Sequence, residues 1–113
     1  MKFSTSKTEL HRGLQKLSKA TPTRSTLPIL SCVLIEVKSD KTILRATDLE
    51  VTIQIELASS YEKQGKAALP LKTLLDITSE LPDIRLTISV DENYKSTIET
   101  EIGKYYLMGK PAE

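Results

Sequence analysis

The stretch from Arg24 to Glu50 constrains the fold more than any other part of the chain. Its apolar core, Leu27 to Val37, is rich in β-branched residues, which favour strands. Ser39 and Asp40 follow as a two-residue turn signal that leads directly into a second apolar run at Ile43. The stretch therefore predicts an antiparallel hairpin.

The two ends of this hairpin carry further structural signals. Pro28 has no backbone donor, so the first strand is expected to begin at or after it, leaving Arg24 to Leu27 as an exposed lead-in. Arg24 is then free to contact a partner. Asp48 is expected to end the second strand, and the alternation of apolar and polar residues from Leu49 to Leu57 predicts a third, half-buried strand.

The rest of the chain repeats one order of elements. A short strand over Met1 to Thr5 precedes a helix that starts at the capping box Ser6 to Glu9 and stops at Thr21-Pro22. The polar segment Ser59 to Gly65 is expected to be a turn between two halves. The second half predicts a strand at Lys66 to Leu69, a helix from Pro70 to Leu81, and strands at 84–90, 95–100 and 104–108.

This order, strand, helix and three strands twice over, indicates an α+β fold in a single domain of 113 residues. We expect two adjacent helices packed on one curved antiparallel sheet. A chain of this length buries enough apolar surface to be stable without a metal or a disulfide.

Basic charge is concentrated at the start of the chain. Residues 1–25 hold six basic side chains against Glu9 alone, a net charge of +5, which leaves −4 for the remainder of a chain whose total is +1. In the first predicted helix three leucines share one stripe, and the opposite face carries Arg12, Gln15, Lys16 and Lys19. Such asymmetry favours a polyanionic partner, although a merely solvated helix face has the same pattern.

The sequence lacks the residues that catalysis or metal binding requires. His11 is the only histidine and is expected to be an ordinary surface residue, while Cys32 lies in an apolar strand as a small buried hydrophobe. Asp76 and Glu80 have no third ligand nearby, and the four glycines stand singly. We expect no cofactor, no metal and no catalytic site. With no membrane helix or signal peptide, a cytoplasmic location is expected.

Several segments together carry a resemblance to a known family. They are MKF at the start, TLPIL at 26–30, TDLE at 47–50, the Leu69-Pro70 pair before the helix that contains Asp76, and GKYYLMGKPAE at the end. In register over the whole chain, they resemble the first domain of the bacterial DNA polymerase III beta subunit, the sliding clamp. The resemblance implies a DNA clamp fold and a non-catalytic processivity factor, in which two three-domain subunits form a homodimeric ring around duplex DNA.

The resemblance also implies roles for individual residues. Positions that match Arg24 and Lys72 face DNA in the family, where some members carry arginine in place of Lys72. The first helix lines the hole in the family, so the candidates for contacts with the DNA backbone are Arg12, Gln15, Lys16 and Lys19. The last strand pairs with the third domain of the other subunit, which nominates Lys104, Tyr105 and Leu107, with Thr73 and Ile77 beside them. DNA polymerase III and the clamp loader would bind domains outside this chain.

Two other interpretations remain open at this point. The predicted edge strand Lys104 to Met108, with its tyrosines, is also typical of a small protein–protein interaction module. An enzyme would require that folding bring carboxylates such as Asp48 and Asp76 together, and it has the least support.

Overall fold

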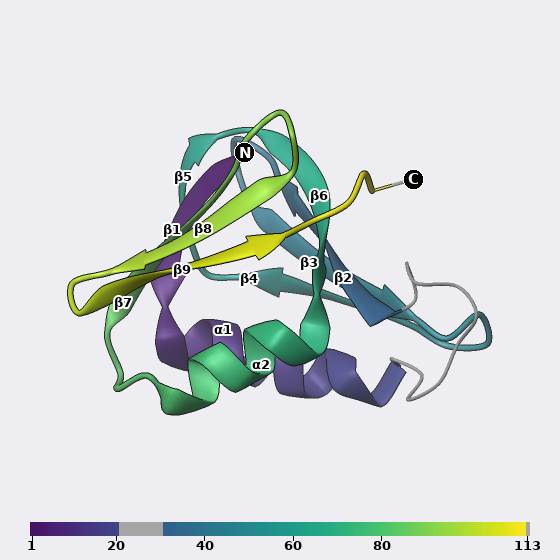
Figure 1. The fold of residues 1–113 in the computed structure, drawn as a ribbon. Helices are drawn as coiled ribbons and strands as arrows, with labels where there is room; N and C mark the ends of the chain where they lie inside the picture. Colours follow the sequence, from purple (N-terminus) through teal and green to yellow (C-terminus); the bar gives the residue numbers. More distant parts are fainter. Residues whose placement is uncertain (21–30, 113) are drawn as a thin grey trace.

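The computed structural model describes residues 1–20 and 31–112 (Figure 1). In these residues the chain forms elements in the order β1 (Lys2–Ser6), α1 (Lys7–Leu17), a 3₁₀ turn (Ser18–Ala20), β2 (Cys32–Val37), β3 (Thr42–Thr47), β4 (Thr52–Leu57), β5 (Ser60–Lys63), β6 (Gly65–Pro70), α2 (Leu71–Glu80), β7 (Arg85–Val90), β8 (Lys95–Thr100) and β9 (Gly103–Met108). The predicted order of strand, helix and three strands, twice over, is confirmed, with β5 added between the two units.

The strands form two antiparallel sheets, with orders β5-β1-β7-β8-β9 and β4-β3-β2-β6. The structure thus divides the expected curved sheet in two, and the isolated bridge between Ala68 and Lys110 joins the sheets at one point. Each unit gives its first strand to the sheet of the other unit, because β1 pairs with β7 and β6 pairs with β2. The two units are therefore interlocked, and neither completes a sheet alone.

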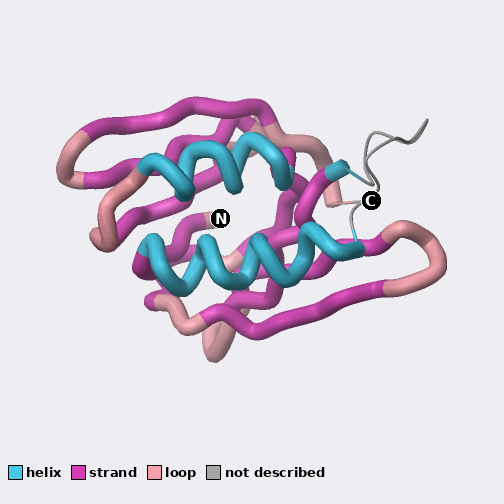
Figure 2. Tube along the Cα trace, turned by 90° about the horizontal axis from the view of Figure 1, so that it is seen from below, coloured by secondary structure: helices cyan, strands magenta, loops and turns pink. Residues whose placement is uncertain are grey.

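The two helices lie side by side beneath the sheets and run in opposite directions (Figures 1 and 2). The core fills the space between these layers, and its largest fully buried side chains include Phe3, Leu10, Leu14, Leu74 and Ile88. This arrangement confirms the α+β class and the adjacent helices on an antiparallel wall. No helix in residues 1–20 or 31–112 has the length and apolar character needed to cross a membrane.

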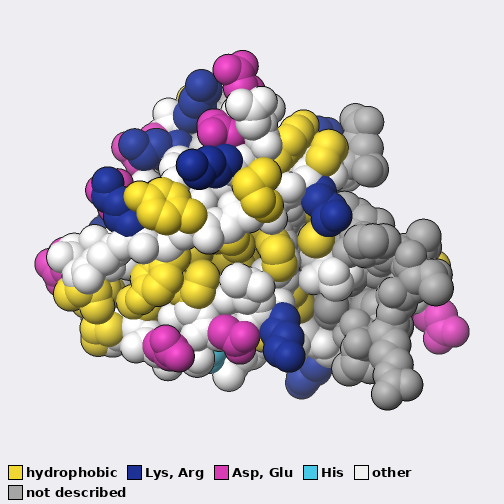
Figure 3. All heavy atoms as spheres, in the orientation of Figure 1, with side chains coloured by type: hydrophobic (Ala, Val, Ile, Leu, Met, Phe, Trp, Pro, Cys, Tyr) yellow, Lys and Arg dark blue, Asp and Glu magenta, His cyan; other side chains and the backbone are white. Residues whose placement is uncertain are grey.

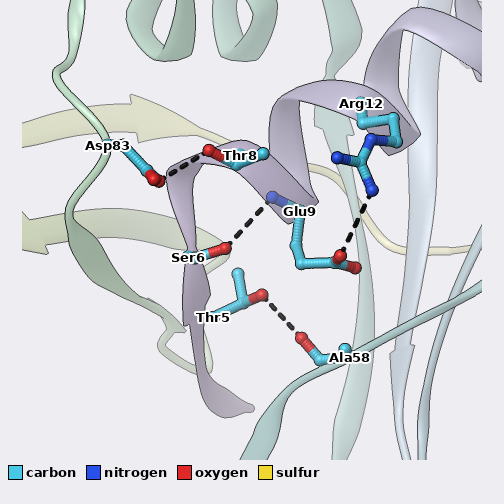
Figure 4. A network of polar contacts seen from close by, with 7 residues as sticks. All are labelled: Thr5, Ser6, Thr8, Glu9, Arg12, Ala58 and Asp83. Carbon is cyan, nitrogen blue, oxygen red and sulfur yellow. Dashed lines mark hydrogen bonds and ion pairs between the residues drawn. The ribbon is translucent and has the colours of Figure 1, made fainter.

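Local hydrogen bonds fix the start of α1 (Figure 4). The Glu9 amide donates to Ser6 Oγ at 3.1 Å, as an N-cap requires. The Glu9 carboxylate lies 3.6 Å from the Arg12 guanidinium, so the expected capping box is only half formed. The Thr8 hydroxyl donates to Asp83 Oδ1 at 2.6 Å, which ties the first turn of α1 to the segment after α2.

Two sequence predictions about the strands were wrong in detail. The segment Ser60–Lys63, expected to be a turn, is β5, whose side chains are all exposed and which pairs with β1 at the edge of its sheet. The strand expected from Leu49 begins only at Thr52, because Asp48 Oδ1 accepts the amides of Glu50 and Val51 and closes a turn. Leu49 there has a φ of 80° and is 71% exposed.

Candidate nucleic-acid interface

The outer face of the helix pair is uncovered. Figure 2 shows α1 and α2 side by side with no other described element in front of them. Their inner stripes are buried against the sheets, at Leu10, Leu14 and Leu17 in α1 and at Leu71 and Leu74 in α2. The opposite stripes are left to solvent or to a partner that approaches from this side.

Cationic side chains gather at one end of this face. Because the helices are antiparallel, the last turn of α1 and its 3₁₀ extension lie beside the first turn of α2. Lys16, Lys19 and Lys72 are exposed there, and Arg12 and Gln15 are exposed on α1. We call Lys16, Lys19 and Lys72, together with Arg12 one turn before Lys16 on α1, the basic end. The structure thus places three of the predicted cations at one end of the helix pair, with Arg12 and Gln15 exposed on α1, while Arg24 lies outside the described residues.

Acidic groups moderate the charge of this face. Arg12 shares its charge with Glu9 in an i, i+3 ion pair in which its own side chain is 60% exposed, so the pair is weak. Asp76 and Glu80 are exposed on α2, beyond Lys72 toward the other end of the helix. The face is therefore basic along α1 and mixed along α2, which the charge count of the first 25 residues does not reveal.

His11 connects the two helices, contrary to its prediction as an ordinary surface residue. Its Nδ1 lies 2.7 Å from Thr78 Oγ1, and that hydroxyl lies 2.9 Å from the Leu74 carbonyl oxygen. When the Thr78 hydroxyl donates to this carbonyl, the imidazole donates to Thr78 through Nδ1–H. Helical spacing alone did not reveal this contact, because the partner lies 67 residues away.

The described residues offer no site for metal chemistry. No group of three or more His, Cys, Asp or Glu side chains lies close enough to hold an ion in this part of the chain. Cys32 is buried as predicted, and this burial raises the pKa of its thiol, which keeps it protonated and poorly nucleophilic.

The edge strand β9 forms a second candidate surface. Tyr105 and Leu107 are half-buried and pack against the core, as does Ile77 of α2. Thr73, one helical turn before Ile77, is exposed on the same flank of α2. Lys104 is exposed and pairs with Glu99 at 3.7 Å. Figure 3 shows a continuous patch of hydrophobic side chains between β9 and α2, so the predicted edge residues border one apolar surface.

The strand β4 is the counterpart of β9 in the first unit. Each is the last strand of its unit and the outer edge of its sheet. In Figures 1 and 2, β9 flanks α2 and β4 flanks α1, at opposite sides of the helix pair. On β4, Ile53 and Ile55 are half-buried in the same way as Tyr105 and Leu107 on β9. The domain therefore has two similar unpaired edges that face in opposite directions.

A comparison with protein families connects this geometry to a known group. The family model described as the N-terminal domain of the DNA polymerase III beta subunit matches residues 1–113. The chain belongs to this family. A beta sliding clamp from Synechocystis is 35% identical over 121 residues, which cover 100% of this chain and 31% of that protein.

Solved beta subunits have the same fold. A chain from Eubacterium rectale superposes with a TM-score of 0.94 at 37% identity, covering 98% of this chain and 30% of that one. The DNA polymerase sliding clamp from Caulobacter crescentus gives a TM-score of 0.92 at 27% identity, with 99% and 31% covered. The present chain thus spans less than a third of the length of these beta subunits and shares the fold of one of their domains.

Proposed function

We propose that this chain is the first of three domains in a sliding clamp and that two such subunits close a ring around duplex DNA. The observation that carries the proposal is the uncovered helix pair with its basic end, on a domain that belongs to the beta subunit family. The coverage of 31% of a relative's length leaves room for two more domains of this size.

In this proposal the basic end contacts phosphate oxygens of DNA that passes along the helices. Long, exposed side chains carry the positive charges of Arg12, Lys16, Lys19 and Lys72. The exposed amide of Gln15 adds a neutral hydrogen-bond donor on α1. Exposed cations contact phosphates without reading sequence, and each contact is screened by salt and readily exchanged. Arg24, which follows the basic end in sequence, belongs to the same proposed set.

The acidic groups on this face suit a sliding contact. Glu9 competes for Arg12, and Asp76 and Glu80 repel phosphate along α2. These groups limit the affinity of any one position on the duplex, so the energy barrier between neighbouring positions stays small. A closed ring stays on DNA by topology, and tight contacts would only slow its movement.

The two unpaired edges are the proposed joints of the ring. The β9 edge, with Lys104, Tyr105, Leu107, Thr73 and Ile77, would pair with the third domain of the other subunit. The matching β4 edge would pair with the next domain of the same subunit. The neighbouring domain at each joint would then pair with the free main-chain N–H and C=O groups of the edge strand. At the β9 joint it would also cover the apolar patch between β9 and α2.

The proposed role needs no catalytic site, because the ring acts by tethering a polymerase to DNA. A polymerase held by a ring rebinds its template intramolecularly, which raises its effective concentration and its processivity. In our proposal DNA polymerase III and the clamp loader bind the other domains, and this domain supplies a DNA-facing segment and a joint.

The gene sequence beyond Glu113 tests this proposal directly. We expect two further segments of similar length, each with the order strand, helix and three strands twice over. A stop codon directly after Glu113 would contradict the three-domain proposal. It would then favour the alternative of a small interaction module, whose exposed Tyr106 and Met108 on β9 would contact a different protein.

A further inference from the structure

The outer face of the five-stranded sheet, on the side away from the helices, carries a row of direct cross-strand neighbours. The register pairs Lys63 with Lys2, Lys2 with Ser89, Ser89 with Thr97 and Thr97 with Tyr106, one residue from each strand. Cross-strand partners project from the same face of a sheet. Their neighbours along the strands, such as Phe3, Ile88 and Ile98, are fully buried against the helices, so the row faces outward.

This row lines a hollow in the surface. The same five residues, with Lys95, Met1, Val90 and Asp91, border an open volume of about 420 Å³. A second hollow of about 610 Å³ adjoins it and shares Met1, Lys63, Val90 and Asp91. We call the surface formed by Lys2, Lys63, Lys95, Ser89, Thr97 and Tyr106 the outer trough. Figure 3 shows Lys and Arg side chains in the upper left of the view, where β1, β8 and β9 lie, with Asp and Glu side chains among them.

No ion pair holds the lysines of the outer trough within the described part of the chain. Lys2 and Lys63 are cross-strand partners next to an irregularity in the β1–β5 register, and like charges on partner residues destabilise a sheet when nothing lies between them. No carboxylate of residues 1–20 or 31–112 lies within ion-pair distance of Lys2, Lys63 or Lys95. Burial and then the neighbouring Lys63 charge lower the pKa of the Met1 amino group, which is consistent with a positive potential there.

The one carboxylate in the 420 Å³ hollow is already engaged. Asp91 Oδ1 accepts the amides of Asn93 at 2.8 Å and Lys95 at 3.0 Å, which closes the turn between β7 and β8. The Lys95 ammonium lies 5.7 Å from the centre of the Tyr106 ring. The trough thus presents three ammonium groups, two hydroxyl groups and one aromatic ring, a set of groups suited to an anionic ligand with some apolar surface.

We propose that the outer trough binds a short acidic segment of a partner protein. Carboxylates of the segment would bind Lys2, Lys63 and Lys95, the hydroxyls of Ser89 and Thr97 would donate to it, and Tyr106 would cover an apolar side chain. The row crosses four interstrand spacings of about 4.8 Å, or about 19 Å, which an extended peptide of about six residues would span.

Rim charges favour a peptide over a nucleic acid. Glu92 borders the larger hollow, and Glu62 and Glu99 are exposed on β5 and β8. A nucleic acid strand carries a charge at every phosphate and would run against these carboxylates as it left the trough. A peptide carries its charges at chosen positions and avoids this repulsion.

The test uses the 113-residue chain and a fluorescein-labelled hexapeptide that contains three glutamates, two glycines and one leucine, followed by fluorescence anisotropy at about 0.1 M salt, where screening extends over roughly 10 Å. We expect the double variant Lys63→Glu/Lys95→Glu to bind at least about tenfold more weakly, in line with the loss of two charge-assisted contacts. The control Lys7→Glu/Arg45→Glu has the same net charge and changes residues outside the trough. It is expected to bind within about twofold of the wild type, since screening removes distant charges.

Thermal unfolding shows whether the variants fold, and Lys63→Glu should raise the melting temperature by removing the like-charge pair with Lys2. Amide chemical shifts in the wild-type chain locate the peptide, with changes expected at Lys2, Ser89 and Thr97. An equal loss in the control variant, shifts confined to α1, or no binding of the peptide would overturn the proposal. Tighter binding of a hexathymidylate at the same residues would assign the trough to nucleic acid and would also overturn it.

Discussion

Salt dependence gives the most direct test of the proposed DNA-facing surface. The basic end offers four cations, Arg12, Lys16, Lys19 and Lys72, on exposed side chains. If each neutralises one phosphate, the logarithm of the association constant should fall with the logarithm of salt concentration with a slope of about −3.6. Between about 50 and 200 mM salt, the affinity for duplex DNA would then fall by about 150-fold. Competition from Glu9 for Arg12 moves the expected slope toward about −2.7.

The assay is an anisotropy titration of the chain against a labelled duplex at several salt concentrations. The variant Lys16→Gln/Lys72→Gln removes two charges without adding negative ones and should reduce the slope by about 1.8. The control Lys63→Gln/Lys95→Gln removes two charges from the opposite side of the molecule and should leave the slope unchanged.

Two results would refute this reasoning. The first is an equal reduction of the salt slope in both variants. It would mean that the chain binds DNA through its overall positive charge and not through the helix face. The second is a marked preference for one duplex sequence, because phosphate contacts alone carry no base readout.

Three further predictions concern stability and are checked by denaturant or thermal unfolding. Gly13→Val should lower the free energy of unfolding by about 1–3 kcal/mol, because a Cβ at this position would lie 2.7 Å from Ile55 Cδ1, and adding Ile55→Val should recover part of the loss. Ser96→Ala should raise it by about 1 kcal/mol, because the buried Ser96 hydroxyl has no partner in the described residues. The amide of Val51, and then that of Glu50, lower the pKa of Asp48 below 3.8, so ionised Asp48 stabilises the fold above that pH. The advantage of the wild type over Asp48→Asn should shrink as the pH falls through the lowered pKa, and a constant difference from pH 7 to about 3 would contradict this.

Much of the fold could be predicted from apolar periodicity. The leucines of α1 and the alternating residues of β7 are spaced so that one face of each must be buried, and the structure buries those faces. The strand β5 gave no such signal, because Ser60–Lys63 is exposed on both faces and is held by its pairing with β1. Leu49 and Val51 gave a false signal, since their apolar spacing continues that of β4 while the Asp48 carboxylate forms a turn there.

The two candidate surfaces differ in how many of their residues could be predicted from the sequence. The exposed cations of α1 follow from helical geometry, so the sequence alone places Lys16 and Lys19 on one face. Lys72 came from the family resemblance, and only the antiparallel packing of the helices brings it to the same end. The outer trough has no sequence signature, because Lys2, Lys63 and Lys95 are scattered along the chain and are brought to one face only by strand register, with Lys95 two residues before Thr97.

The exchange of first strands between the two units bears on how such a domain came to exist. In a lone unit of one helix and four strands, the first strand would have no partner and the sheet would lack one strand. Two identical copies could exchange their first strands and form an entwined dimer. Joining those copies by a short linker such as the one at Gln64 would yield this domain. Cutting the chain there should accordingly produce two halves that fold only when mixed.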